Sequence, residues 1–168
     1  MWQVIGHEKA VALLERSMKG GKLSHAYLFV GPPHVGKMTL AMNLAQALNC
    51  RGEERPCGEC PQCRRIARGV HADVQVIGLE GRMEIGIDQI REMQHAASLK
   101  PFEGRNRVFI IDGADHLSHE AANCLLKTLE EPPPNDQLIL LAANERLLLP
   151  TVLSRCQKLE LGPLPAPV

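Results

Sequence analysis

One short segment constrains the fold of this chain more than any other. The apolar run AYLFV at residues 26–30 is followed directly by GPPHVGKMT at residues 31–39. The run is typical of a buried strand, and residues 37–49 carry the apolar pattern of a helix that begins at Lys37. A strand, a glycine-rich loop and a helix in this order gather unpaired backbone N–H groups around an anion. The segment therefore predicts an α/β fold with a phosphate-binding loop.

The loop matches most of the phosphate-binding pattern G-x-x-x-x-G-K-[ST]. Gly31, Gly36 and Lys37 stand where the pattern requires them. Met38 replaces the Ser or Thr whose hydroxyl binds magnesium, and Thr39, one helical residue later, points about 100° away. We expect a phosphate loop that is impaired in magnesium binding. The alternative is a tight strand-to-helix turn with an incidental lysine.

Alternating strands and helices follow the loop. Apolar periodicity and breakers place strands at 73–79, 107–112, 137–144 and 156–161, and helices at 7–19, at 87–99 and from Ser118 to the prolines at 132–134. Strands that are apolar throughout are typical of a parallel sheet that is covered on both faces. We therefore predict a five-stranded parallel sheet with helices on both faces, in one domain at residues 1–161.

The strand at 107–112 ends in Asp112, which is the usual position of the acid that orients magnesium beside a phosphate loop. The next residue is Gly113, where a hydrolytic site needs a glutamate to activate water. Asp115 is a second candidate base, although a solvated carboxylate at the strand exit is the favoured interpretation. The loss of both the hydroxyl ligand and the base predicts a chain that hydrolyses nucleotide poorly.

Four of the six cysteines lie close together in the pattern C-x6-C-x2-C-x2-C, at Cys50, Cys57, Cys60 and Cys63. Four thiolates at such spacings predict a closed, structural zinc site rather than a catalytic one. Cys124 and Cys156 stand in apolar segments and are expected to be buried.

Charge and hydropathy exclude some partners. The chain has 19 Lys+Arg and 19 Asp+Glu, so attraction to nucleic acid requires a local patch. Lys100, Arg105 and Arg107 are candidates for phosphate contacts, although a solvated rim is the favoured interpretation. No run of 18 apolar residues and no segment of signal-peptide type occurs. We expect a cytoplasmic protein that does not contact a membrane.

Several segments together resemble the N-terminal AAA+ domain of bacterial DNA polymerase III clamp-loader subunits, over essentially residues 1–161. They are HAYLFVGPPHVGK, the four-cysteine insertion, RVFIIDGADHLSHEAANCLLKTLEEPPP and LLPTVLSRC. The resemblance implies an AAA+ fold of the P-loop NTPase type, with a zinc module at 50–63. It also implies that residues 162–168 begin a linker to a lid and a helical collar that this chain lacks.

The resemblance assigns roles to individual residues. It implies a nucleotide site made of Gly31, Pro32, Pro33, His34, Val35, Gly36, Lys37, Met38, Thr39, Asp112 as the Walker B acid and Asn144 at the sensor-1 position. Arg155, in the sequence SRC, is implied to be an arginine finger that acts in trans on a neighbouring subunit. The alternative for Arg155 is an ion pair with Glu130 or Glu131. His34 stands where related loops often have glycine, and it is expected to crowd the phosphate cradle.

Three functions follow as hypotheses. Met38 and Gly113 favour a subunit of the delta-prime type, a largely non-hydrolysing stator that works with gamma/tau and delta subunits to load the sliding clamp on primed DNA. An active ATPase subunit of the gamma/tau type is the second hypothesis, and a zinc-stabilised module that binds only proteins is the third. Structural zinc is the expected cofactor, binding of ATP or ADP is left open, and magnesium is not favoured.

Overall fold

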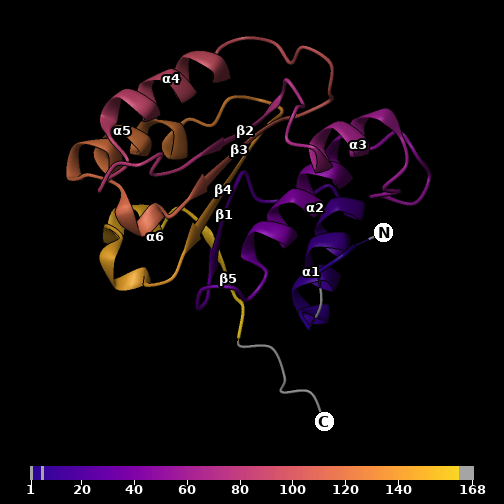
Figure 1. Ribbon diagram of the computed structural model, residues 1–168, viewed down its shortest axis with the longest axis horizontal. Helices are drawn as coiled ribbons and strands as arrows, with labels where there is room; N and C mark the ends of the chain where they lie inside the picture. Colours follow the sequence, from indigo (N-terminus) through magenta and orange to yellow (C-terminus); the bar gives the residue numbers. More distant parts are fainter. Residues whose placement is uncertain (1, 5, 163–168) are drawn as a thin grey trace.

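Five parallel strands form one sheet in the order β2-β3-β4-β1-β5. The computed structural model describes residues 2–4 and 6–162, and Figure 1 shows the sheet running through the centre of the molecule. The strands are β1 (Ala26–Val30), β2 (Val74–Ile77), β3 (Arg107–Asp112), β4 (Asp136–Ala142) and β5 (Gln157–Glu160). Residues 163–168 of the expected linker lie outside the described residues.

Helices cover both faces of this sheet (Figure 1). One face carries α1 (Glu8–Lys19), α2 (Lys37–Asn49) and α3 (Pro61–Ala67), and the other carries α4 (Ile87–Ala97), α5 (His119–Glu130) and α6 (Pro150–Leu153). Two short 3-10 turns, η1 (Ala114–His116) and η2 (Glu145–Leu147), follow β3 and β4. The predicted parallel sheet with helices on both faces is confirmed. Neither α3 nor α6 was predicted, because seven and four residues are too short to show an apolar period in the sequence.

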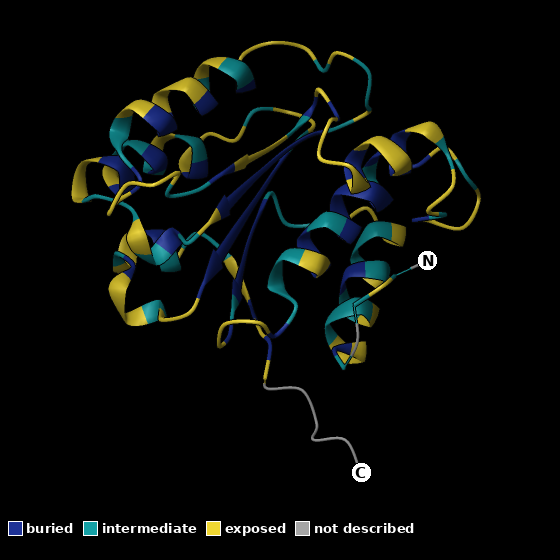
Figure 2. Ribbon diagram, viewed as in Figure 1, coloured by how far each residue is buried: buried dark blue, intermediate teal, exposed yellow. Residues whose placement is uncertain are grey.

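The sheet separates two apolar cores. Successive residues of β1 alternate between them, so that Ala26 and Leu28 pack under α4 and α5 while Tyr27 and Phe29 pack under α1 and α2. The three inner strands are buried on both faces, as Figure 2 shows in dark blue. This double burial explains why their sequences are apolar throughout.

The edge strands differ from the prediction. In β2, Gln75 and Val76 are exposed, and in β5 only Leu159 is buried. A strand at the edge of a sheet has one neighbour, and here no helix shields it completely. Both edge strands are therefore shorter than expected. Cys124 and Cys156 were also predicted to be buried, but each is only partly buried against the core.

A buried carboxylate holds the loop between α4 and β3. The Asp73 side chain is fully buried and accepts backbone N–H groups from Phe102, Glu103 and Gly104 at 2.6, 2.6 and 2.7 Å. Arg107 Nη2 lies 3.7 Å from Asp73 Oδ1, and this guanidinium is itself buried. Arg107 is therefore a structural residue and not part of a solvated rim, whereas Lys100 and Arg105 are exposed.

We expect Asp73→Asn to lower the free energy of unfolding at pH 7 by about 2–4 kcal/mol, because it leaves buried donors and Arg107 without their charged partner. Burial alone raises the pKa of Asp73, but the three N–H donors and Arg107 outweigh burial and hold that pKa below its ordinary value. A depressed pKa stabilises the fold above the unfolded-state pKa of about 3.9 and stops doing so as the pH falls through the folded-state value.

Urea unfolding of both proteins at pH 7 and at pH 3 measures this difference. It should be smaller at pH 3 than at pH 7. Equal stabilities at pH 7 would contradict the role assigned to Asp73.

Candidate functional site

The carboxyl ends of three adjacent strands bring the predicted nucleotide-site residues together. The phosphate loop follows β1, Asp112 ends β3, and β4 lies between these two strands. The three strand ends surround a hollow of about 750 Å³. Of the predicted residues, those that line it are Pro33, His34, Gly36, Lys37, Met38, Thr39 and Asp112. Gly31, Pro32, Val35 and Asn144 do not line it.

The loop backbone has the left-handed turns that a phosphate cradle needs. His34 has φ 62° and Gly36 has φ 102°. Left-handed geometry costs a non-glycine residue about 1–2 kcal/mol, so at His34 the loop keeps its shape against a local strain. Gly31 is required for a different reason, since a Cβ atom there would overlap the Leu161 carbonyl oxygen.

Two contacts anchor the loop. Val35 is buried, and its carbonyl oxygen accepts a hydrogen bond from His7 Nε2 at 2.7 Å. Lys37 Nζ donates to the Gly31 carbonyl oxygen and lies 3.4 Å from the Ala142 carbonyl oxygen. Partial burial lowers the pKa of Lys37, and the carboxylates of Asp115 and Asp112 offset part of this effect. The ammonium group is therefore held at the mouth of the loop, beside the end of β4.

The backbone at Gly113 does not suit a glutamate. Gly113 has φ 94°, and a Cβ atom built on it would lie 3.2 Å from His116 Cδ2. Both the left-handed backbone and the imidazole oppose a side chain at this position. His116 also lines the hollow, and nothing in the sequence had marked it.

Asp115 braces two strand ends. Its Oδ2 accepts the backbone N–H groups of Ala143 and Asn144 at 3.1 and 3.2 Å. Asp115 therefore ties η1 to the exit of β4 through hydrogen bonds that are themselves exposed to solvent. The Asn144 side chain turns away from the hollow, and its Oδ1 accepts the N–H of Arg146 at 3.1 Å.

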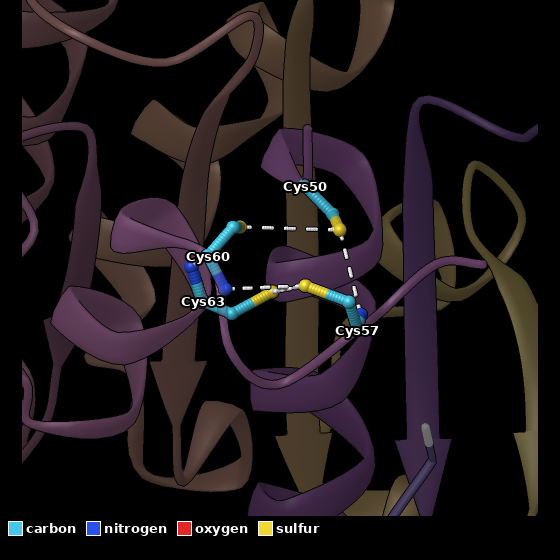
Figure 3. A group of neighbouring side chains, drawn as sticks. All are labelled: Cys50, Cys57, Cys60 and Cys63. Atoms are coloured by element: carbon cyan, nitrogen blue, oxygen red, sulfur yellow. Dashed lines mark hydrogen bonds between the residues drawn. The ribbon is translucent and has the colours of Figure 1, made fainter. Parts of the chain in front are cut away.

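The four predicted metal ligands come together. Their sulfur atoms all lie within 4.8 Å of one another. Figure 3 shows the side chains of Cys50, Cys57, Cys60 and Cys63 gathered in one cluster. Backbone N–H groups point at the sulfurs, with Cys60 N at 3.2 Å from Cys57 Sγ and Cys63 N at 3.4 Å from Cys60 Sγ. Such donors stabilise thiolates, which are the form that binds metal. The donor set and its spacing therefore fit a metal ion with four sulfur ligands.

The thiol pKa values differ within the cluster: they lie below the ordinary value at Cys57 and Cys60, whereas burial raises the pKa of Cys63 to about 12. Hydrogen bonds from the backbone at Glu59 and Cys60 lower the pKa of Cys57. Burial raises the pKa of Cys60, but backbone hydrogen bonds from Arg51 and Cys63 outweigh it and bring the value to about 6. Gln46 Nε2 donates to the Cys63 carbonyl oxygen at 2.9 Å and joins the cysteine segment to α2. The cysteine segment is thus attached to α2, the helix that begins at the phosphate loop.

Arg155 lies at the amino ends of the parallel strands, whereas the phosphate loop lies at their carboxyl ends. Gln157 begins β5 and pairs with Tyr27 of β1, so Arg155 lies close to the level at which β1 starts. The loop begins where β1 ends, about 20 Å away at the rise of a strand. An arginine side chain cannot span this distance, so Arg155 does not serve the hollow of its own chain.

Arg155 also makes the ion pair that was considered as its alternative role. Its Nη2 lies 3.0 Å from Glu130 Oε1. Glu130 is the last residue of α5, and the side chains of Arg155 and Glu130 are 35 % and 51 % exposed. The sequence could name Glu130 as a partner but could not choose between it and Glu131.

Comparisons with known proteins agree with this geometry. Residues 6–165 match the sequence model of the family described as DNA polymerase III, delta subunit. The chain belongs to the DNA polymerase III clamp-loader family. It is 38 % identical over 157 residues to DNA polymerase III subunit delta' of Bacillus subtilis, an alignment that covers 93 % of this chain and 47 % of the relative. It is also 38 % identical over 163 residues to the tau/gamma subunit of Haemophilus influenzae, covering 96 % and 23 %.

Solved structures place the clamp-loader domain in the AAA+ fold. A gamma subunit-related protein of DNA polymerase III from Thermotoga maritima superposes with a TM-score of 0.68 at 24 % identity, covering 92 % of this chain and 46 % of that one. The RuvB branch migration motor of the same organism superposes with a TM-score of 0.57 at 21 % identity, covering 92 % and 43 %. The chain spans less than half the length of each of these relatives. None of the described helices is both long enough and apolar enough to cross a bilayer.

Proposed function

We propose that this chain is the AAA+ domain of a clamp-loader stator of the delta-prime type. In this proposal it completes the ATP site of a neighbouring subunit with Arg155 and does not turn over ATP at its own site. The observation that carries the proposal is the place of Arg155, which is partly exposed and lies about 20 Å from its own phosphate loop. A guanidinium in that position does not reach the phosphate loop of its own chain, which leaves it available to the nucleotide site of a neighbouring one.

The chain's own site supports the second half of the proposal. Met38 offers a thioether where magnesium needs a hydroxyl, and Gly113 leaves no base beside Asp112. The strained loop at His34 nevertheless keeps the form of a cradle, and Lys37 stands at its mouth. We infer that this loop binds the phosphates of ATP or ADP through backbone N–H groups and Lys37, with little contribution from magnesium.

The wider assembly is inferred from the names of the relatives. Subunits called delta' and tau/gamma are parts of DNA polymerase III, so the proposed partners are gamma/tau and delta subunits. The sliding clamp and primed DNA are the proposed substrates of the complex. We propose that the AAA+ domain extends over residues 1–161 and that residues 162–168 lead to a lid and collar. The cysteine segment at 50–63 is proposed to bind one structural Zn²⁺ ion, because four thiolates form the tetrahedral donor set that zinc prefers.

Nucleotide binding and turnover by the purified full-length protein test this proposal. We expect binding of ATP or ADP that changes little when magnesium is removed, and no steady-state hydrolysis above background. Lys37→Ala should weaken binding, because it removes the ammonium group at the loop mouth. Robust magnesium-dependent hydrolysis that Lys37→Ala abolishes would contradict the proposal. It would favour an active subunit of the gamma/tau type, an alternative that the presence of Lys37 and Asp112 supports.

A rescue experiment tests whether the site lacks only the hydroxyl ligand and the base, or whether its backbone also opposes their return. Met38→Thr with Gly113→Glu supplies both lost groups, which act as a unit and therefore must be restored together. Because Gly113 is left-handed and faces His116, we expect this double variant to gain little turnover and to lose about 1–2 kcal/mol of stability. Adding His116→Ala makes room for the new side chain and should improve the gain. Full activity of the double variant alone would show that the backbone at 113 adapts freely.

A further inference from the structure

The guanidinium of Arg155 lies between the C-terminal ends of two helices. Its Nη1 donates to the Thr151 carbonyl oxygen in α6 at 2.9 Å, and its Nη2 lies 3.0 Å from the carboxylate of Glu130 at the end of α5. Helix C-termini carry partial negative charge, so the end of the twelve-residue α5 attracts a cation. A main-chain carbonyl and a carboxylate therefore hold the head of this side chain from two sides.

Both helix ends are themselves fixed. His25 Nε2 lies 3.1 Å from the Leu129 carbonyl oxygen, and Leu129 is buried in the core. The prolines at 132–134 prevent α5 from continuing past Glu131. In α6, Val152 is fully buried and its carbonyl oxygen accepts the N–H of Arg155 at 3.1 Å. The position of Glu130 relative to Arg155 is thus set by the packing of both helices and not by two free side chains.

The contacts leave part of the guanidinium available. An arginine head has five N–H groups, and three of them are engaged here. Their acceptors are the Thr151 carbonyl oxygen, the Glu130 carboxylate and, at a longer 3.4 Å from Nη1, Ser154 Oγ. The remaining N–H groups are oriented by the same contacts, because the guanidinium is planar and rigid. A donor fixed in advance stabilises a transition state better than one that must be ordered during the reaction.

We propose that Glu130 is a positioning residue that holds the Arg155 guanidinium ready for the phosphate of a neighbouring subunit's nucleotide. This inference rests on the proposed role of Arg155 in trans. Exposed ion pairs are individually weak, so loss of Glu130 costs little folding stability. Its effect falls on the orientation of Arg155, and therefore on the rate of hydrolysis at the completed site rather than on assembly.

Glu131 provides a matched control. It is the next residue, it is exposed, and it takes part in no ion pair among the residues that the structure describes. Its backbone N–H caps α5 through the Lys127 carbonyl oxygen, a contact that a side-chain substitution leaves intact. Glu130→Gln and Glu131→Gln therefore remove the same charge from the same helix end, but only Glu130→Gln removes the partner of Arg155.

The experiment uses the full-length protein in a reconstituted complex with an active ATPase neighbour, clamp and primed DNA. We expect Glu130→Gln to lower kcat for ATP about twofold to fivefold with KM for ATP and assembly unchanged. Glu131→Gln should match the wild type, and Glu130→Asp should recover part of the loss. In an Arg155→Ala background, Glu130→Gln should have no further effect, because a residue that acts through Arg155 has nothing left to position.

The outcomes separate this inference from the proposed function. If Arg155→Ala lowers turnover but Glu130→Gln does not, Glu130 does not position the finger, and the proposed function stands. A faster Glu130→Gln variant would identify the ion pair as a restraint, which also overturns the inference. Additive losses in the double variant would place the role of Glu130 elsewhere. If Arg155→Ala itself has no effect, the proposed function fails together with this inference.

Discussion

Arg155→Ala in the full-length protein is expected to lower the rate of ATP hydrolysis at the neighbouring site by about 10³–10⁵-fold, the range that arginine fingers contribute elsewhere. The reason is that the guanidinium stabilises charge that develops on the phosphate in the transition state more than it stabilises the ground state. Single-turnover hydrolysis in a reconstituted loader, with clamp and primed DNA present, measures the effect at that site.

The controls distinguish chemistry from folding. Arg155→Lys keeps the charge that pairs with Glu130 but lacks the planar fork, so it should preserve stability without restoring the rate. Loss of the exposed ion pair should cost at most about 1 kcal/mol of unfolding free energy. If Arg155→Ala assembles normally and hydrolyses ATP at the wild-type rate, Arg155 is structural and the stator proposal loses its main support.

Cys63→Ser is expected to abolish stoichiometric zinc binding and to lower the free energy of unfolding by about 3 kcal/mol or more, equivalent to about 6–12 °C in Tm. Cys63 is fully buried, and its carbonyl oxygen receives Gln46 from α2. We expect faster hydrogen exchange in residues 50–67 while β1, β3 and β4 stay protected, because these strands lie outside the cysteine segment.

Cys124→Ser is the matched control for this change. Cys124 lies outside the cysteine cluster, and its Sγ lies 3.2 Å from Gln94 Oε1, a contact that a serine hydroxyl can keep. Metal analysis, thermal unfolding and hydrogen exchange on both variants test the prediction. Native protein that contains no zinc, or a Cys63→Ser protein that retains it fully, would contradict the proposed metal site.

The sequence by itself determined the parts of this protein that depend on local chemistry. The run AYLFV with its glycine loop predicted β1, the phosphate loop and the start of α2, because short-range steric rules and apolar periodicity act within a few residues. The cysteine spacing predicted a cluster that the fold assembles, since cysteines with two residues between them can bind the same ion. The sequence alone also shows that Met38 stands where the phosphate-loop pattern has Ser or Thr, and that Gly113 stands where a hydrolytic site has glutamate.

Only the tertiary structure decided what depends on residues far apart in the chain. Strand order brought Asp115 to the amides of Ala143 and Asn144, a contact that the sequence did not predict. Packing of α5 against α6 selected Glu130 as the partner of Arg155. The length of β1 separates that arginine from the phosphate loop, which lies at the other end of the strand. Such contacts are set by the summed burial of whole elements, and no local pattern contains that information.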